Sequence, residues 1–175
     1  MFENFTTHTI STSGAKINAV VGGEGPPLLM LHGFPETHTM WHKVAPELAK
    51  DFTLVIPDLR GYGDSEKIGS DPLHYNYSKR AMAQDQVEVM EYLGHSKFFL
   101  AGHDRGARVS HRLAKDNQEK VEKIILLDII PTREMFKQVN QSMATSSYHW
   151  FFLIQEEPFP ETLIGGSGEY YVKSR

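Results

Sequence analysis

The chain has 175 residues, 40% of them hydrophobic and 23% charged, which is typical of an ordinary globular protein. Its formal net charge is −4, so a nucleic-acid-binding face, which needs a surplus of lysine and arginine, is not expected. Cysteine is absent, which excludes disulfide bonds and thiolate metal ligands within the chain. The length suits one domain with a substantial core and is too short for two large ones.

The N-terminal segment "MFENFTTHTI" lacks the basic and apolar regions of a secretory signal peptide. No run in the chain approaches the ~20 apolar residues that cross a bilayer. We therefore expect a cytoplasmic protein with no membrane partner.

The first expected elements are strands. Residues 5–12 and 15–21 alternate loosely between polar and apolar side chains and meet at a Ser-Gly pair, which predicts a hairpin. The run "LLMLHGFP", from Leu28, is typical of a strand buried on both faces. Residues 38–50 carry apolar side chains at helical spacing and predict a helix.

The next segment, "FTLVIPDLRGYGDS" from Phe52, predicts a buried strand followed by a glycine-rich loop. We expect this loop to be held in an ordered conformation by the side chains of Asp58, Arg60, Tyr62 and Asp64. Strands that alternate with helices predict an α/β fold with a mostly parallel sheet. The remaining expected elements are a helix over residues 79–93, a strand over 97–101, a helix over about 105–116 and a strand over 123–127.

The character of the chain changes after Pro131. Residues 133–156 are helix-like and rich in aromatic side chains, so we divide the chain into a core, residues 1–130, and a second segment, residues 131–175. The apolar strand "IILLD" at the edge of a parallel sheet is normally covered by further strands. We therefore expect that more of this sheet lies outside the chain.

The segment "GHDRG", residues 102–106, has the small-x-acid-x-small pattern of a nucleophile elbow, a sharp strand-to-helix turn that needs glycines. Its central residue is Asp104. A carboxylate there can attack a saturated carbon and form an ester, which water then hydrolyses. For the loop "LHGFP", which is expected to face this turn, the alternative is a Gly-Pro turn that merely ends a strand.

Ester hydrolysis creates an oxyanion, which needs two backbone N–H donors. One is the residue after the nucleophile, Arg105, and the other is Phe34 in "LHGFP". We expect His32 and His103, which flank these two loops, to shape them by hydrogen bonding rather than to act as bases.

Two arginines, Arg105 and Arg108, stand in the first turn of the helix after Asp104, where the helix dipole disfavours cations. Their placement predicts a site for an anion. The alternative is that one of them only pairs with Asp104 or Asp128.

The motifs "HGFP", "DLRGYGDS", "GHDRGAR", "LLDIIPT" and "YHWFFLIQ" resemble those of the haloacetate and fluoroacetate dehalogenases of the α/β-hydrolase fold, over about residues 4–165. The resemblance implies the six N-terminal strands of that fold and the beginning of a helical cap domain over residues 131–175. It implies that Asp104 is the nucleophile, that Arg105 and Arg108 bind the substrate carboxylate, and that Asp128 orients the catalytic histidine. It also implies that His149 and Trp150 donate hydrogen bonds to the departing halide. The alternatives are core packing for Trp150 and a capped or solvent-facing His149.

The implied reaction is hydrolysis of a haloacetate, a small-molecule substrate, to glycolate and halide with no cofactor or metal. The resemblance also implies a homodimer. The triad of this fold follows the chain order nucleophile, acid, histidine. We therefore expect that the catalytic histidine, the C-terminal core strands and the rest of the cap are absent from this chain, so that Asp104 can be alkylated but its ester hydrolyses very slowly.

Two other functions stay open. An epoxide hydrolase uses the same aspartate nucleophile, with tyrosine acids from the cap and no need for two arginines. A catalytically incomplete remnant of the fold, acting as a binding module or inert, is the third hypothesis.

Overall fold

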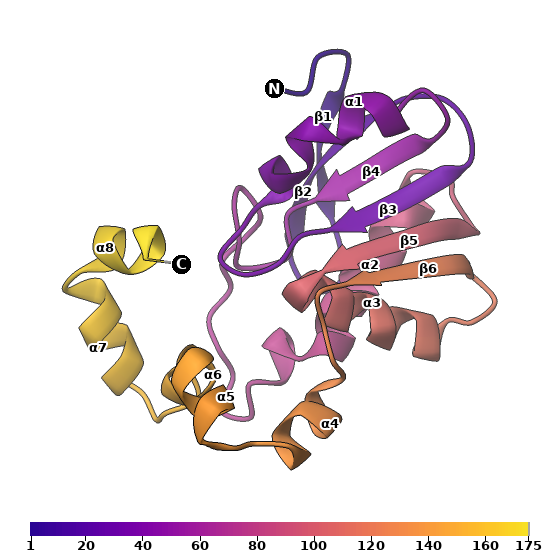
Figure 1. Ribbon diagram of the computed structural model, residues 1–175. Helices are drawn as coiled ribbons and strands as arrows, with labels where there is room; N and C mark the ends of the chain where they lie inside the picture. The colour runs from indigo at the N-terminus through magenta and orange to yellow at the C-terminus, as the bar shows by residue number, and fades with distance from the viewer. Residues whose placement is uncertain (175) are drawn as a thin grey trace. The chain divides into compact units, whose positions relative to one another are not determined.

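The computed structural model describes residues 1–174, and the chain divides into two compact units, Met1–Ile129 and Ile130–Arg175. The first unit contains the sheet (Figure 1). The second contains short helices. Its assignment to a cap domain stays a prediction.

The sheet has six strands in the described chain, in the order β1-β2-β4-β3-β5-β6. The strand β1 pairs antiparallel with β2, and β2 pairs antiparallel with β4, whereas β4, β3, β5 and β6 run parallel. The predicted hairpin and the mostly parallel α/β sheet are therefore confirmed. The strands are β1 (Thr6–Ser11), β2 (Lys16–Gly22), β3 (Pro27–Leu31), β4 (Thr53–Pro57), β5 (Phe98–His103) and β6 (Val121–Leu127).

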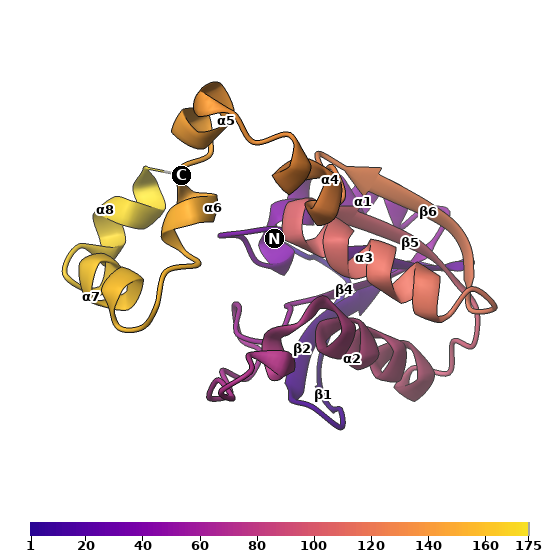
Figure 2. The same ribbon diagram turned by 90° about the horizontal axis from the view of Figure 1, so that it is seen from below.

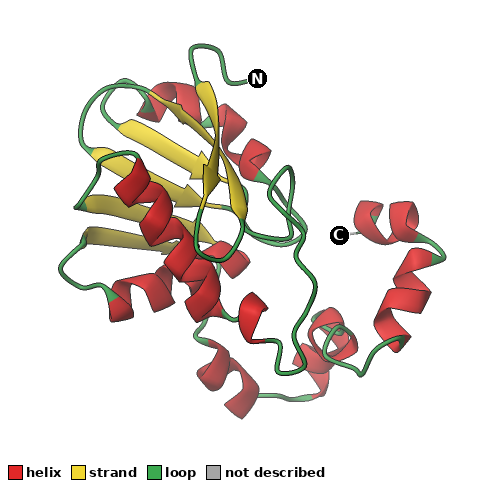
Figure 3. Cartoon of the chain, turned by 180° about the vertical axis from the view of Figure 1, so that it is seen from behind, coloured by secondary structure: helices red, strands yellow, loops and turns green. Residues whose placement is uncertain are grey.

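The central strands are buried on both faces of the sheet. Alternate side chains of a strand point to opposite faces. In β3, Leu29 and Leu31 join the core beneath two helices, α2 (Lys79–Tyr92) and α3 (Asp104–Asp116), which lie in front of the sheet in Figure 3. Leu28 and Met30 of the same strand pack in a second core cluster. The short apolar strands predicted from the sequence are explained by this double coverage.

One helix prediction is wrong. Residues 38–50 form two short pieces, the 3-10 helix η1 (His38–Lys43) and α1 (Ala45–Leu48), instead of one helix. The reason is Pro46, which stands in the first turn of α1. Proline has no N–H to donate and its ring clashes with the preceding turn, so a helix can begin at this residue but cannot run through it.

The second unit begins with the predicted helix-like segment, which is divided into α4 (Thr132–Lys137), α5 (Gln141–Ser146) and α6 (His149–Phe152). Two further helices, α7 (Phe159–Gly165) and α8 (Gly168–Lys173), follow and were not predicted, because the glycines of "LIGGSGEYYVKSR" favour turns. Across residues 1–174 we find no helix with the length and apolar character needed to cross a membrane.

The edge strand β6 exposes aliphatic side chains. Ile125 is 58% exposed, and its neighbours Ile124, Leu126 and Leu127 are also exposed. An apolar groove of about 830 Å³, lined in part by Trp41 and Ile125, lies beside the strand. Coverage of this edge by further strands stays a prediction.

Burial predicts effects of very different size for two aliphatic substitutions. Leu29→Ala, at a fully buried position, should lower the free energy of unfolding by about 2–5 kcal/mol, because it removes packed methyl groups and leaves a cavity. Ile125→Thr should change it by only about 0.5 kcal/mol, because the side chain is mostly exposed and threonine keeps the β-branch. Urea unfolding followed by circular dichroism measures both, and equal losses would contradict the burial of the sheet described above.

Candidate active site

The turn between β5 and α3 holds Asp104 in a left-handed backbone conformation, with φ of +45°. Residues other than glycine rarely adopt this backbone conformation. Those that do cluster at functional sites. A Cβ added to Gly102 would lie 2.7 Å from the Gly106 carbonyl oxygen, and one added to Gly106 would lie 2.3 Å from that of His32. Both glycines of the motif are therefore required by close backbone approach.

The loop that follows β3 reaches this turn. The backbone N–H of Phe34 donates a hydrogen bond to Oδ1 of Asp104 over 2.9 Å. The guanidinium of Arg105 lies over the Phe34 ring, 5.2 Å from its centroid, at cation–π distance. The structure thus brings together three of the residues predicted from the sequence.

Glu36 ties the two loops to each other, and the sequence analysis missed it. Its Oε2 accepts a hydrogen bond from the Gly33 N–H at 2.9 Å and lies 3.0 Å from Nδ1 of His103. One carboxylate oxygen therefore holds the Phe34 loop and the residue before Asp104. The sequence shows it only as an acidic residue directly after "HGFP", which is ordinary on a protein surface and is no distinctive signal.

His32 is fully buried, with both ring nitrogens engaged. Its Nδ1 lies 2.8 Å from the Gly33 carbonyl oxygen, and its Nε2 is 3.0 Å from the N–H of Leu59. Because a carbonyl only accepts and an N–H only donates, the proton is on Nδ1. Burial lowers the pKa of His32, so the ring is neutral and shapes the loop, as expected from the sequence.

The surroundings of Asp104 are rich in positive charge. Arg105 and Arg108 both lie in the first turns of α3. Burial lowers the pKa of Arg108, and the charge of Arg105 lowers it as well, whereas the Asp104 carboxylate raises it. Burial also raises the pKa of Tyr62, and the charges of Arg105 and Asp104 act on its hydroxyl in opposite directions. The four side chains therefore form one electrostatic cluster.

Asp128 directly follows β6. The last residues of the two parallel strands, His103 and Leu127, are paired in the sheet, so the two aspartates follow at the same edge. Asp128 is also left-handed, with φ of +53°, and its side chain is exposed. Its role in orienting a histidine stays a prediction.

His149 and Trp150 lie in α6 of the second unit. The Trp150 ring packs edge-on against Phe136 at 5.9 Å, and the His149 ring lies 6.1 Å from that of Tyr148. Their assignment as halide donors stays a prediction.

The loop after β4 is organised by Asp58. Its Oδ1 accepts hydrogen bonds from the backbone and ring nitrogens of His38, at 2.7 and 2.9 Å, and its Oδ2 accepts from Asn18 and Asp64. Burial pushes the pKa of Asp58 upward, but the hydrogen bonds outweigh it and lower the pKa from 3.8 to about 2. The hydrogen bond to Asp58 also raises the pKa of His38.

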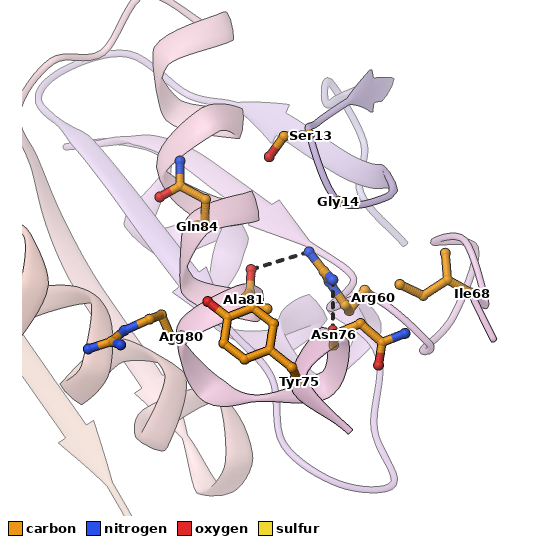
Figure 4. Close-up of a pocket in the computed structure, with 9 residues that line it drawn as sticks. All are labelled: Ser13, Gly14, Arg60, Ile68, Tyr75, Asn76, Arg80, Ala81 and Gln84. Carbon is orange, nitrogen blue, oxygen red and sulfur yellow. Dashed lines mark hydrogen bonds between the residues drawn. The ribbon is translucent and has the colours of Figure 1, made fainter. Parts of the chain in front are cut away.

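A second cavity, of about 400 Å³, lies next to the buried Arg60 and not at Asp104 (Figure 4). Arg60 donates to both carboxylate oxygens of Asp85, each at 2.6 Å, and to the carbonyl oxygens of Asn76 and Ala81. Because each nitrogen of the guanidinium has a partner, we interpret Arg60 as structural. In residues 1–174 no three His, Asp or Glu side chains converge to hold a metal ion.

The low pKa of Asp58 predicts an acid-sensitive stability. The ionised form is favoured by folding, so its contribution is complete above pH 3.8 and is lost as the pH falls through about 2. The shift corresponds to about 2 kcal/mol. Urea unfolding at a series of acidic pH values should show a steeper loss of stability for the unmodified chain than for Asp58→Asn. The exposed control Asp51→Asn should keep the original profile, and parallel curves for all three would contradict the role of Asp58.

Comparison with known proteins finds relatives that are named as hydrolases. A model of the α/β hydrolase fold family matches residues 26–165. A fluoroacetate dehalogenase from Burkholderia sp. is 49% identical over 171 residues, which cover 98% of this chain and 56% of that protein. A soluble epoxide hydrolase from Corynebacterium sp. (strain C12) is 41% identical over 131 residues, 75% of this chain and 44% of that protein.

Among solved structures, the crystal structure of an α/β hydrolase from Nostoc sp. PCC 7120 is 58% identical, with a TM-score of 0.98. The match covers 99% of this chain and 60% of that one. The chain spans about half the length of the curated relatives it matches. By its sequence and its sheet, the chain belongs to the α/β hydrolase fold family.

Proposed function

We propose that this chain carries the nucleophile and the anion-binding residues of a haloacetate dehalogenase. The observation that carries the proposal is the placement of Asp104, left-handed at the end of β5, bound by the Phe34 N–H and accompanied by Arg105 and Arg108. A carboxylate nucleophile with two adjacent guanidinium groups suits a substrate that has both a displaceable group and a negative charge. The similarity to a fluoroacetate dehalogenase supports the same substrate class.

In the first step, a carboxylate oxygen of Asp104 forms a bond to the carbon that bears the halogen. The carbon–halogen bond breaks and its electron pair leaves with the halide, so the product is an ester on the enzyme. Arg105 and Arg108 hold the substrate carboxylate, and the N–H groups of His149 and Trp150 stabilise the departing halide.

In the second step, water adds to the ester carbonyl of Asp104, and the bond from that carbon to the glycolate oxygen then breaks, so that the carboxylate is restored and glycolate leaves with the proton taken from water. The oxyanion that forms accepts hydrogen bonds from the backbone N–H groups of Phe34 and Arg105, and a histidine oriented by Asp128 takes the proton from water. The one histidine that follows Asp128 in these 175 residues is His149, which is assigned to the halide. For this chain we therefore expect the ester to accumulate.

An epoxide hydrolase is the second candidate, and the similarity to a soluble epoxide hydrolase favours it. The same aspartate would open the epoxide ring while an acid protonates the ring oxygen. An epoxide is neutral and gains nothing from a pair of guanidinium groups, so the two candidates differ in the charge of the substrate.

The test is alkylation of the purified, folded chain by chloroacetate and, separately, by a simple epoxide. We expect chloroacetate to add one carboxymethyl group to Asp104, as read from the intact mass and peptide mapping. Asp104→Asn should abolish the adduct. Arg108→Met should slow its formation by about tenfold to a hundredfold, because a hydrogen bond to a charged group contributes about 1.5–3 kcal/mol.

An adduct formed by the epoxide alone would establish the second candidate instead. A folded chain that reacts with neither compound would contradict both and leave the incomplete remnant. Circular dichroism of the same samples verifies folding for each variant.

A further inference from the structure

A lysine that the proposed reaction does not use begins α2. Lys79 is the first residue of this helix, and the Ser78 side chain caps the helix by accepting from the Ala81 N–H. The Lys79 side chain is partly buried, and its Nζ donates to Sδ of Met82 at 3.8 Å. Within residues 1–174, none of the salt bridges pairs Lys79 with a carboxylate.

The topology brings the start of α2 to the edge of the sheet where Asp104 lies. The strands β4, β3 and β5 are parallel, α2 connects β4 to β5, and α3 connects β5 to β6. In such crossover connections each helix runs back against the strands, so both helices begin at the carboxyl ends of the strands. The two helices pack side by side, as Figures 1 and 2 show. Lys79 and Asp104 therefore begin neighbouring helices at the same edge.

The charges that act on Lys79 belong to the cluster already described. Burial lowers the pKa of Lys79, the charges of Arg105 and Arg108 also lower it, and Asp104 opposes them, so that the pKa falls from 10.5 to about 8. The start of a helix is also the end at which its dipole disfavours a cation. The charges of three cations and one carboxylate thus act on one another, an arrangement that a second negative charge would stabilise.

We propose that Lys79 is a third cationic residue of the Asp104 site, which binds the substrate carboxylate with Arg105 and Arg108 and selects anionic over neutral substrates. This inference rests on the proposed function, because it names a residue that determines specificity for that reaction. The alternative is a structural lysine whose stem packs on Met82 while its ammonium reaches solvent.

The proposal predicts how selectivity depends on pH. The ammonium is mostly charged below pH 8 and neutral above it. Alkylation of Asp104 by chloroacetate should therefore slow as the pH rises through about 8, by about tenfold or more relative to neutral chloroacetamide, since one hydrogen bond to a charged group is lost. The neutral reagent controls for every effect of pH that does not involve the substrate charge.

Three variants make the test specific. Lys79→Gln should have a low chloroacetate-to-chloroacetamide rate ratio that no longer changes with pH. Lys79→Arg should keep a high ratio that is also independent of pH, because arginine stays charged. Lys50→Gln, which removes an exposed lysine paired with Glu47, should behave like the unmodified chain. A Lys79→Gln ratio equal to that of the unmodified chain would overturn the inference while leaving the nucleophile established.

A second measurement is needed if Asp104 reacts with neither reagent, a result that would overturn the proposed dehalogenation. Acetate, an unreactive anion, should protect Lys79 from reductive methylation by formaldehyde, as read by peptide mapping, and should not protect Lys50. Protection would support the anion site without the chemistry. Equal labelling of Lys79 with and without acetate would contradict the anion site.

Discussion

The hydrogen bond from the Phe34 N–H to Asp104 joins two loops that are far apart in the sequence, and the geometry of the site depends on it. The turn that carries Asp104 is left-handed at that residue, Gly102 lets β5 approach the start of α3 closely, and Gly106 lets α3 approach the end of β3. Glu36 joins the same two loops through Gly33 and His103. The strained turn is therefore kept in place by more than one contact, which is how backbone strain persists at a functional site.

The features that the sequence predicted well are those set by local pattern and by backbone sterics. Short apolar strands predict a doubly covered sheet, and the glycines around Asp104 predict a tight turn, because no other residue fits there. The single helix over residues 38–50 was predicted wrongly. Apolar side chains at helical spacing indicate one helix there, but Pro46 allows a helix to begin and not to continue through it.

Glu36 and Lys79 could not be predicted in the same way. A carboxylate after "HGFP" and a lysine at the start of a helix are each ordinary on a protein surface. Their significance arises from the topology, which packs α2 against α3 and places the loop after β3 against the end of β5. Contacts between residues separated by 67 positions, as for Glu36 and His103, leave no periodic signal in a single sequence.

The local charge of the site is opposite to that of the whole chain, whose formal net charge is −4. Charges on the surface are screened beyond about 8 Å at physiological ionic strength, so the acidic surface does little to repel an anion that has reached the site. Partly buried cations such as Arg108 and Lys79 are screened less, and burial has already removed some of their hydration. In the proposed reaction, selection among substrates by charge would thus depend on short-range contacts beside Asp104, and the electrostatic attraction of the whole protein would contribute little to it.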